Sequence, residues 1–340
     1  MIDIVVPDAV MDFLGGGHSF VLVGHEEPDG DCVASQLALA SYLRRRGANT
    51  YLCSVGPFNR PEIAEYADRF SAAIPSPAID DKGAAVVLDC STAERTGGLA
   101  GAIATLPALV VDHHSSGTEF GDLRFVEPGS PSTALLVQLI IERNDRLTTD
   151  EAQLLMFGMC TDTGFFRHLD ATSAAVFAAT SRLVAAGADP RTTYERIYGN
   201  RSFERRKLLG RQLERAEWLA PGVLYTHQTV ADLDALSEQA RGDDDLYMLL
   251  RAVAGADVVA FAREERSGGC SVSLRSAASV DVGAVALQLG GGGHRQAAGF
   301  SWPGSLAAIR AELSHKLPAA ITATPSADPP LAARSPGHRK

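Results

Sequence analysis

Short apolar runs, several of which end in acidic or imidazole side chains, constrain the fold of this chain more than any other feature. The runs are SFVLVG (19–24), NTYLCS (49–54), AAVVLD (84–89) and ALVVD (108–112). Each is rich in β-branched residues and has the length of one buried strand, and the clearest helical pattern, at 31–46, stops at Gly47. Continuous apolar strands joined by helical crossovers predict an α/β fold with a parallel sheet covered on both faces.

A mostly helical stretch follows the predicted sheet, and a second strand-and-helix unit follows that stretch. Helical patterns cover 132–144, 149–160, 172–187, 190–199 and 202–219, and strand patterns resume at 223. We therefore predict a smaller α/β C-terminal domain, with a cleft between it and the N-terminal domain. The predicted boundaries are 1–190 for the N-terminal domain, 191–221 for a helical linker, 222–317 for the C-terminal domain and 318–340 for a disordered tail rich in Pro, Ala and Ser.

Length, charge and cysteine usage narrow the classes of function. A length of 340 residues favours two domains. The net charge of −10 argues against a protein that coats long nucleic acids, but it allows a small phosphate substrate in a local basic pocket. The sequence has no long apolar run, no signal-peptide pattern and five cysteines without close pairs. We expect a cytoplasmic protein with no membrane span and no disulfide framework.

Side chains that can bind metal gather where the predicted elements end. They are His25, Asp29 and Asp31 after the first run, Asp89 after the third, Asp112, His113 and His114 after the fourth, and Asp162 after a helical segment. Taken singly, each has a simpler explanation, because such an aspartate often caps a helix or forms a turn and two adjacent histidines can be a buried polar pair. Taken together they predict one metal site, because the carboxyl ends of parallel strands meet at one edge of the sheet.

The donor types indicate which metals suit this predicted site. Carboxylates with a minority of imidazoles and no thiolates favour Mn²⁺ or Mg²⁺, with Co²⁺ or Zn²⁺ as alternatives. Two such ions, about 3.5–4 Å apart, would activate a water molecule and hold a phosphoryl oxygen. The neighbouring Cys32, Cys90 and Cys160 are interpreted as small buried fillers.

Several segments resemble the motifs of a known family. HEEPDGDCVAS, VVLDCS, VVDHHSSG and CTDTGFFR are similar to motifs of the DHH phosphoesterase superfamily, and SLRS and GGGGHRQAAGF are similar to its DHH-associated C-terminal domain. The resemblance covers residues 20–317. The two-domain size most resembles the NrnA-type oligoribonucleases and 3′-phosphoadenosine-5′-phosphate (pAp) phosphatases, with relatives that hydrolyse cyclic di-AMP and pApA. One departure is Ala34, which stands where the first motif is expected to carry glycine.

The resemblance implies a role for each residue of these motifs. His25 and Asp29 would hold one metal ion, Asp31, His113 and Asp162 a second, and Asp89 would bridge both. His114 would face the scissile phosphate, and Asp112 would orient the two histidines. Substrate phosphate would be bound in the C-terminal domain by Arg275, Ser276, Gly291, Gly292, Gly293 and His294, with Arg295 as a further candidate.

The function implied is hydrolysis, by water activated between two divalent ions, of short oligonucleotides (nanoRNA), pApA, cyclic di-AMP or pAp. Mn²⁺ is the expected cofactor, with Mg²⁺ or Co²⁺ as alternatives. Short RNA or dinucleotides are the expected partners, and a homodimer is compatible with the resemblance. The alternatives are an inorganic pyrophosphatase, a RecJ-like single-strand exonuclease and a non-enzymatic nucleotide-binding regulator. The segment GGGGHRQAAGF argues against a pyrophosphatase, and the lack of a basic face or extra domain argues against the exonuclease. The complete set of ligand positions argues against a non-enzymatic regulator.

Overall fold

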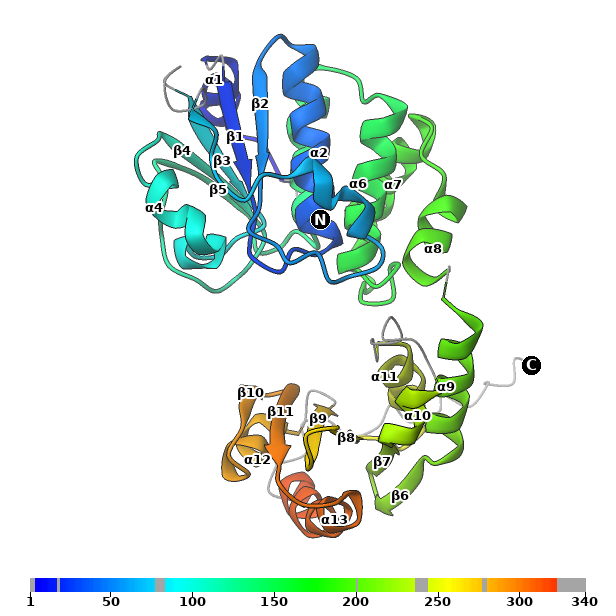
Figure 1. Ribbon diagram of the computed structural model, residues 1–340. Coiled ribbons are helices and arrows are strands. Elements are labelled where there is room, and N and C mark those ends of the chain that lie inside the picture. The colour runs from blue at the N-terminus through cyan, green and yellow to red at the C-terminus, as the bar shows by residue number, and fades with distance from the viewer. Residues whose placement is uncertain are drawn as a thin grey trace, which may run out of the picture. The chain divides into compact units, whose positions relative to one another are not determined.

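The chain divides into two units that each contain one sheet, Met1–Asn200 and Arg201–Lys340. Figure 1 shows the elements of both units in the computed structural model, which describes residues 4–16, 19–76, 83–199, 201–235, 244–276 and 280–322. The segment predicted as a linker is shared between the units. Its helix α8 (Pro190–Tyr198) belongs to the first unit, and α9 (Phe203–Glu214) belongs to the second.

The first unit is built on a five-stranded parallel sheet with the order β2-β1-β3-β4-β5. Its strands are β1 (Ser19–Val23), β2 (Asn49–Cys53), β3 (Ala84–Leu88), β4 (Ala108–Asp112) and β5 (Leu123–Val126). Phe20 and Leu22 pack into one hydrophobic cluster, whereas Val21 and Val23 pack into another. Alternate residues of the strands therefore bury both faces of the sheet, as predicted.

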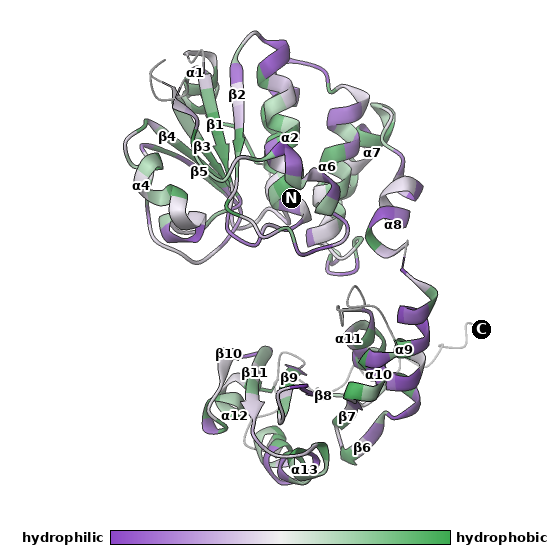
Figure 2. Ribbon diagram, viewed as in Figure 1, coloured by the Kyte–Doolittle hydropathy of each residue, from purple (hydrophilic) through white to green (hydrophobic). Residues whose placement is uncertain are grey.

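Helices cover the two faces unequally. The larger cluster, on the Phe20 side, includes residues of α1 (Asp8–Gly16), α2 (Gly30–Arg45), α5 (Thr133–Asn144), α6 (Thr149–Asp162) and α7 (Ala174–Ala185). The smaller cluster includes residues of η2 (Ala93–Leu99) and α4 (Ala100–Ile103). A further short helix, η1 (Ala64–Arg69), lies between β2 and β3 in the sequence. Figure 2 shows the hydrophobic strands of this sheet beside helices with mixed surfaces.

The second unit contains a mixed six-stranded sheet with the order β10-β11-β9-β8-β7-β6, in which only β7 and β8 are parallel. Its strands are β6 (Glu217–Ala220), β7 (Val223–Gln228), β8 (Val258–Glu264), β9 (Cys270–Ser276), β10 (Gly292–His294) and β11 (Ala297–Trp302). Its further helices are α10 (Val230–Asp234), α11 (Asp244–Arg251), α12 (Val282–Gln288) and α13 (Leu306–Thr322). The predicted smaller α/β domain is confirmed.

Two predictions at the margins of the second unit need correction. The helix expected over 202–219 ends at Glu214, because Pro221 and Gly222, the latter at φ 81°, reverse the chain and pair β6 with β7. The tail expected from 318 begins inside α13, because Leu317 is buried in the core and Ile321 packs against it. The rest of that predicted tail, 323–340, lies outside the described residues.

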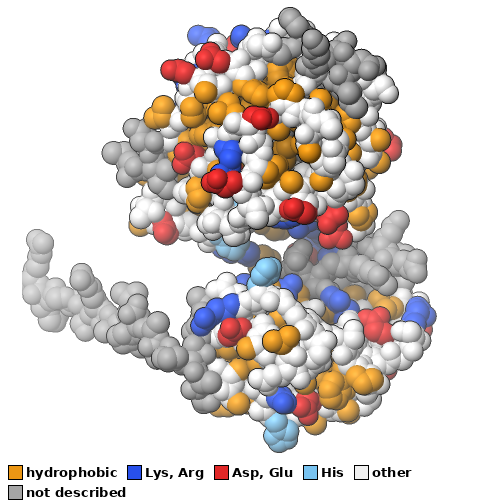
Figure 3. Space-filling view, turned by 90° about the vertical axis from the view of Figure 1, so that its left-hand side faces the viewer, with side chains coloured by type: hydrophobic (Ala, Val, Ile, Leu, Met, Phe, Trp, Pro, Cys, Tyr) orange, Lys and Arg blue, Asp and Glu red, His pale blue; other side chains and the backbone are white. Residues whose placement is uncertain are grey.

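The structure bears on two further expectations, namely no broad basic face and no membrane span. Figure 3 shows that Lys and Arg side chains on the displayed face occur singly or in small groups and do not merge into a continuous basic area. None of the described helices combines the length and apolar character that a membrane crossing requires.

Candidate metal centre

The candidate ligands of the first unit come together at one edge of its sheet. His25 follows β1, Asp89 follows β3, His113 follows β4, and Asp162 is the last residue of α6. Donor atoms within 4.8 Å of one another form three groups: His25, Cys32 and Asp89; Asp89, His113 and His114; and Asp31, His113 and Asp162. Asp29, the N-cap residue of α2, lies beside the first group, with 3.8 Å between its Oδ1 and Nε2 of His25.

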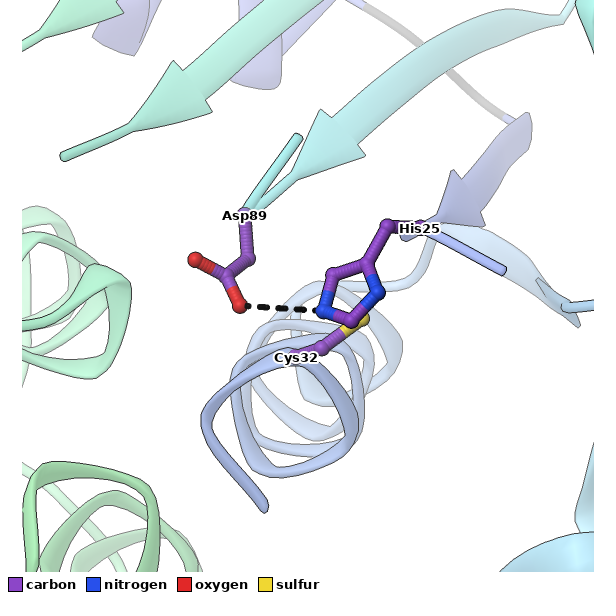
Figure 4. A group of neighbouring side chains, drawn as sticks. All are labelled: His25, Cys32 and Asp89. Atoms are coloured by element: carbon purple, nitrogen blue, oxygen red, sulfur yellow. Dashed lines mark ion pairs between the residues drawn. The ribbon is translucent and has the colours of Figure 1, made fainter. Parts of the chain in front are cut away.

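The Asp89 carboxylate lies between two imidazoles. Its Oδ2 is 3.6 Å from Nε2 of His25, and its Oδ1 is 3.5 Å from Nε2 of His113. Figure 4 shows the His25 ring and the Asp89 carboxylate pointing at one another. Asp89 has a left-handed backbone conformation, with φ 58°, which an aspartate tolerates better than most residues. One carboxylate can therefore offer a separate oxygen to each of two neighbouring cations.

Backbone carbonyls set the orientation of both imidazoles. Nδ1 of His25 lies 2.7 Å from the carbonyl oxygen of Glu26, and Nδ1 of His113 lies 3.2 Å from that of Ser130. Carbonyl oxygens only accept hydrogen bonds, so Nδ1 carries the proton in each ring. In the neutral ring the lone pair is then on Nε2, the atom that faces the carboxylates. This arrangement is typical of metal-binding histidines.

The charges of the centre are unbalanced in favour of the carboxylates. Burial lowers the pKa of His25, but Asp29 and Asp89 outweigh it and raise that pKa to about 10. Burial also opposes the charge of His113, but Asp162, Asp89 and Asp31 raise its pKa to about 11. Burial, together with neighbouring carboxylates, raises the pKa of Asp31 and of Asp162. Several carboxylates that repel one another, together with imidazoles that can be neutral, form a donor set that fits divalent cations.

Asp31 fastens the first turn of α2 to the start of α5. Its Oδ2 accepts a hydrogen bond from the amide of Thr133 at 2.6 Å, and its Oδ1 accepts one from the amide of Ala134 at 2.9 Å. These amides belong to the N-terminal turn of α5, where the helix dipole favours a negative charge. The fully buried side chain is thereby fixed next to His113 and Asp162.

Small residues let α2 approach α6 closely at this point. A Cβ atom at Gly30 would lie 2.4 Å from the side chain of Thr161, so only glycine fits there. Ala34, the residue that departs from the resembled motif, is accommodated by Gly158 of α6, where an added Cβ would lie 3.1 Å from the Ala34 Cβ. The absence of a side chain at Gly158 leaves room for Asp31, Ala134 and the Ala34 methyl.

The second histidine of the pair is held differently from the first. Nδ1 of His114 lies 2.7 Å from Oδ1 of Asp112, and the two histidine rings are 4.7 Å apart. The Asp112 carboxylate raises the pKa of His114. The His114 side chain is 32% exposed, the most exposed of the three histidines of the centre. His114 is thus placed to meet a molecule that arrives from solvent.

Two residues of this centre were not predicted as participants. Thr133 donates a hydrogen bond from Oγ1 to Oδ1 of Asp89 at 3.0 Å. Cys32 is close enough to His25 and Asp89 to be a third donor, as Figure 4 shows. Burial and the neighbouring carboxylates raise the pKa of its thiol, which donates to Oε1 of Gln36 at 3.6 Å. All five cysteines are buried and free, and three of them, Cys32, Cys90 and Cys160, are those interpreted from the sequence as small buried fillers.

Arg275 and His294, two candidate phosphate-binding residues of the second unit, lie on its sheet. Ala297 of β11 pairs with Arg275 of β9 on one side and with His294 of β10 on the other. Residues directly opposite in register project to the same face, so Arg275 and His294 share a face about 10 Å apart. The Arg275 guanidinium lies 4.8 Å from the centre of the Tyr247 ring. His294 is exposed.

Three of the other predicted phosphate-binding residues have visible structural roles. Ser276 is buried, and its hydroxyl donates to the carbonyl of Val280 at 2.7 Å, so this hydroxyl is already engaged. A Cβ at Gly291 would lie 2.2 Å from the Gly299 carbonyl, and one at Gly293 would lie 2.5 Å from Cα of Ala298. Close packing of the β10–β11 hairpin thus requires glycine at these two positions. Gly292 has open space around it, and Arg295 is exposed.

Two family models match this chain, and it is similar to proteins of known activity. Residues 19–159 match the DHH family, N-terminal domain, and residues 240–319 match the DHHA1 domain. The chain is 31% identical over 287 residues to the bifunctional oligoribonuclease and PAP phosphatase NrnA of Thermus thermophilus, covering 82% of this chain and 83% of that protein. It is 24% identical to the cyclic-di-AMP phosphodiesterase PdeA of Listeria monocytogenes, covering 85% of this chain and 46% of PdeA.

A solved structure supports the fold. An exopolyphosphatase-related protein from Bacteroides fragilis superposes with a TM-score of 0.75 and 21% sequence identity, covering 90% of this chain and 94% of that one. The predicted two-part α/β architecture is confirmed by this similarity and by the two sheets of the structure.

Proposed function

The chain belongs to the DHH family, and from this premise we propose that it is a Mn²⁺-dependent phosphodiesterase that hydrolyses short oligonucleotides and dinucleotides. The observation that carries the proposal is the Asp89 carboxylate, whose two oxygens face Nε2 of His25 and Nε2 of His113. The similarity to the oligoribonuclease and PAP phosphatase of T. thermophilus supports short RNA and pAp as substrates. The similarity to PdeA supports cyclic di-AMP.

The centre offers ligands for two divalent cations. His25 and Asp29 would hold one, Asp31, His113 and Asp162 would hold the other, and Asp89 would serve both. Bound divalent cations would lower the pKa of a water molecule and offset the charge of the phosphate. The residues themselves keep this geometry fixed, because the imidazoles are held by backbone carbonyls and Asp31 is held by α5.

His114 is the residue we propose to act on the phosphate directly. Asp112 accepts a hydrogen bond from the Nδ1–H group of His114 and stabilises the protonated ring. Nε2 can then donate a hydrogen bond to a phosphoryl oxygen. A donor aimed at an oxygen on which charge develops stabilises the transition state more than the ground state. The exposure of His114 agrees with this role.

Arg275 and His294 are the residues we propose to bind a phosphate other than the one being hydrolysed. They share one face of the second sheet, and β11, which lies between them, has the small Ala297 opposite both. Arginine offers a planar fork of donors to a phosphate, and an exposed imidazole offers one more. Such binding favours a substrate with at least two phosphates or nucleotides.

A substrate panel tests the proposal. Initial rates with Mn²⁺ and with Mg²⁺ would be measured on pAp, pApA, cyclic di-AMP, RNA of about two to five nucleotides, RNA of about 25 nucleotides and pyrophosphate. We expect the short substrates to be cleaved at least about tenfold faster than the long RNA, because the chain carries a net charge of −10. Preferential cleavage of pyrophosphate, equal rates on short and long RNA, or no hydrolysis at all would each contradict it.

A further inference from the structure

A cavity of the first unit has the chemistry of a binding site, and none of the metal-centre residues lines it. It has a volume of about 660 Å³ and is lined by residues of α2, η1, α6 and α8. α2 packs on α6, and α6 packs on α8, so one wall of the cavity belongs to the rigid core. This volume is within the range of about 300–1,000 Å³ that is usual for small-molecule sites.

Arginines dominate the rim of this cavity, but they are not equivalent. Arg45 is paired with Asp145 and Glu151, and Arg196 is paired with Glu65. Arg44 and Arg69 also line the cavity, and within the described part of the chain neither forms an ion pair. Among the described residues no carboxylate therefore lies at ion-pair distance from either guanidinium, although Asp150 also lines the cavity.

Arg44 and Arg69 are close enough to affect one another. Burial, together with the charge of Arg69, lowers the pKa of Arg44. Arg44 donates from Nη2 to the carbonyl of Thr50 at 3.2 Å, which fixes its direction but not its charge. Two guanidinium groups that face the same space repel one another unless an anion lies between them. A phosphate suits this arrangement, because its oxygens match the donor fork of arginine.

The floor of the cavity is apolar. Leu37 and Phe157 are buried, and Leu154 is partly buried beside them. Tyr66 closes one side, with its ring 6.0 Å from the Arg69 guanidinium and 5.1 Å from that of Arg196. Arg196 also lies over the Phe157 ring at 5.4 Å. These contacts hold η1 against α8, so the rim is positioned before any ligand arrives.

We propose that this cavity binds a mononucleotide, with Arg44 and Arg69 on the phosphate and the apolar floor of Leu37, Leu154 and Phe157 against the base. The site would be additional to the metal centre and to the Arg275 face. It does not depend on the proposed hydrolysis, because its residues take no part in that reaction.

Equilibrium binding to the full chain tests the proposal. Isothermal titration calorimetry with AMP would be carried out in EDTA on an Asp89→Asn background, so that neither the metal centre nor hydrolysis contributes. We expect saturable binding of AMP that is weakened at least about tenfold by Arg44→Ala and by Arg69→Ala, since each removes a charged hydrogen bond to phosphate. Arg124→Ala is the matched control, because Arg124 belongs to the same unit and pairs with Glu119 outside the cavity.

Further measurements test the contributions of the phosphate and of the base to binding separately. Adenosine and inorganic phosphate should each bind more weakly than AMP, and Arg44→Lys should retain part of the affinity because it keeps the charge. Circular dichroism would establish that the variants are folded. The proposal is overturned if AMP does not bind, if Arg44→Ala and Arg69→Ala bind AMP like the control, or if Arg275→Ala alone removes binding. Phosphate that binds as tightly as AMP would overturn the assignment of the floor to a base.

Discussion

Oδ1 of Asp112 accepts a hydrogen bond from Nδ1 of His114 at 2.7 Å, and the same oxygen accepts the backbone amide of His113 at 2.9 Å. Asp112 is 2% exposed, so the accepting carboxylate is sheltered from water. The carboxylate thus fixes the protonated nitrogen of His114 and the direction of its ring. On the proposed function, Asp112 would act on the substrate only through that ring, as a positioning residue.

This relationship predicts a non-additive pair of variants. His114→Ala should lower kcat by about 100-fold, the size expected for loss of a positioned proton donor. Asp112→Asn should lower kcat by at least about tenfold, because the amide can present its NH₂ group to Nδ1 and favour the wrong tautomer. The double variant should be no slower than His114→Ala alone. Additive losses, or a drop in Mn²⁺ content measured by mass spectrometry, would show that Asp112 does not act through His114.

A second prediction concerns Asp89. Asp89→Asn keeps the size of the side chain and tolerates φ 58°, but it replaces one of the two oxygens that face His25 and His113. We expect loss of both bound cations and a fall in kcat of at least about 100-fold, since a two-ion centre contributes several kcal/mol to catalysis. Asp162→Asn is the comparison, because among the described residues Asp162 belongs to one donor group, with its Oδ2 3.1 Å from Nε2 of His113, whereas Asp89 belongs to two; it should lose one cation. Equal cation loss in the two variants would contradict the bridging role.

A third prediction separates substrate binding from chemistry. Arg275→Ala and His294→Ala should each lower kcat/KM on a dinucleotide by about tenfold or more, because each removes a charged or polar contact to a remote phosphate. Hydrolysis of bis-p-nitrophenyl phosphate, which lacks a second nucleotide, should fall much less, and the metal content should not change. Arg266→Ala is the control, since Arg266 is exposed and pairs with Asp234. Parallel losses on both substrates would assign these residues to the catalytic centre or to folding.

A fourth prediction concerns stability and pH in the second unit. The buried Asp232 accepts hydrogen bonds from Arg215 and Arg211 and from the amide of Thr229 at 2.9 Å. Burial alone would raise its pKa, but Arg215 and Thr229 outweigh burial and hold the pKa below its usual range. At neutral pH, Asp232→Asn should lower the free energy of unfolding by about 1–3 kcal/mol.

The pH dependence of this loss follows from the sign of the pKa shift. The folded pKa is lower than the unfolded value of about 3.9, so the carboxylate stabilises the fold fully above that pH and loses its contribution as the pH falls through the folded pKa. Urea unfolding should therefore show a difference between wild type and Asp232→Asn that shrinks below about pH 4. Asp234→Asn, at an exposed ion pair, should have little effect at any pH. A difference that does not vary with pH would exclude the carboxylate as its source.

Local pattern was sufficient for much of the fold. β1, β3 and β4 are continuous apolar runs because both faces of the sheet are covered, and the sequence predicts them almost to the residue. The sequence does not predict β5, because Phe125 is the one buried residue of this strand and no continuous apolar run marks it. Glu217–Ala220 extends a helical pattern in the sequence, and only its pairing with β7 makes it a strand. These errors occur where tertiary contacts decide between two locally acceptable conformations.

The candidate site likewise combines residues that the sequence predicts with contacts that it does not. The acidic and imidazole residues are visible in the sequence because strand ends converge, whereas the carbonyls of Glu26 and Ser130 that orient His25 and His113 carry no sequence signature. Thr133 is an ordinary residue at the start of a helix until α5 is packed against Asp89. Arg44 and Arg69 come together only through the packing around η1. Contacts of this kind join distant segments and cannot be deduced from spacing.

The left-handed backbone at Asp89 has a cost in folding free energy. A non-glycine residue in this region sacrifices about 1–2 kcal/mol of folding free energy, somewhat less for aspartate. Glu27, Phe165 and Phe166, which lie near His25 and Asp162 in the sequence, have positive φ values as well. A glycine at position 89 would relieve the strain and remove the carboxylate at once. Selection for thermal resistance alone would therefore favour loss of the carboxylate at position 89, and with it the proposed metal centre.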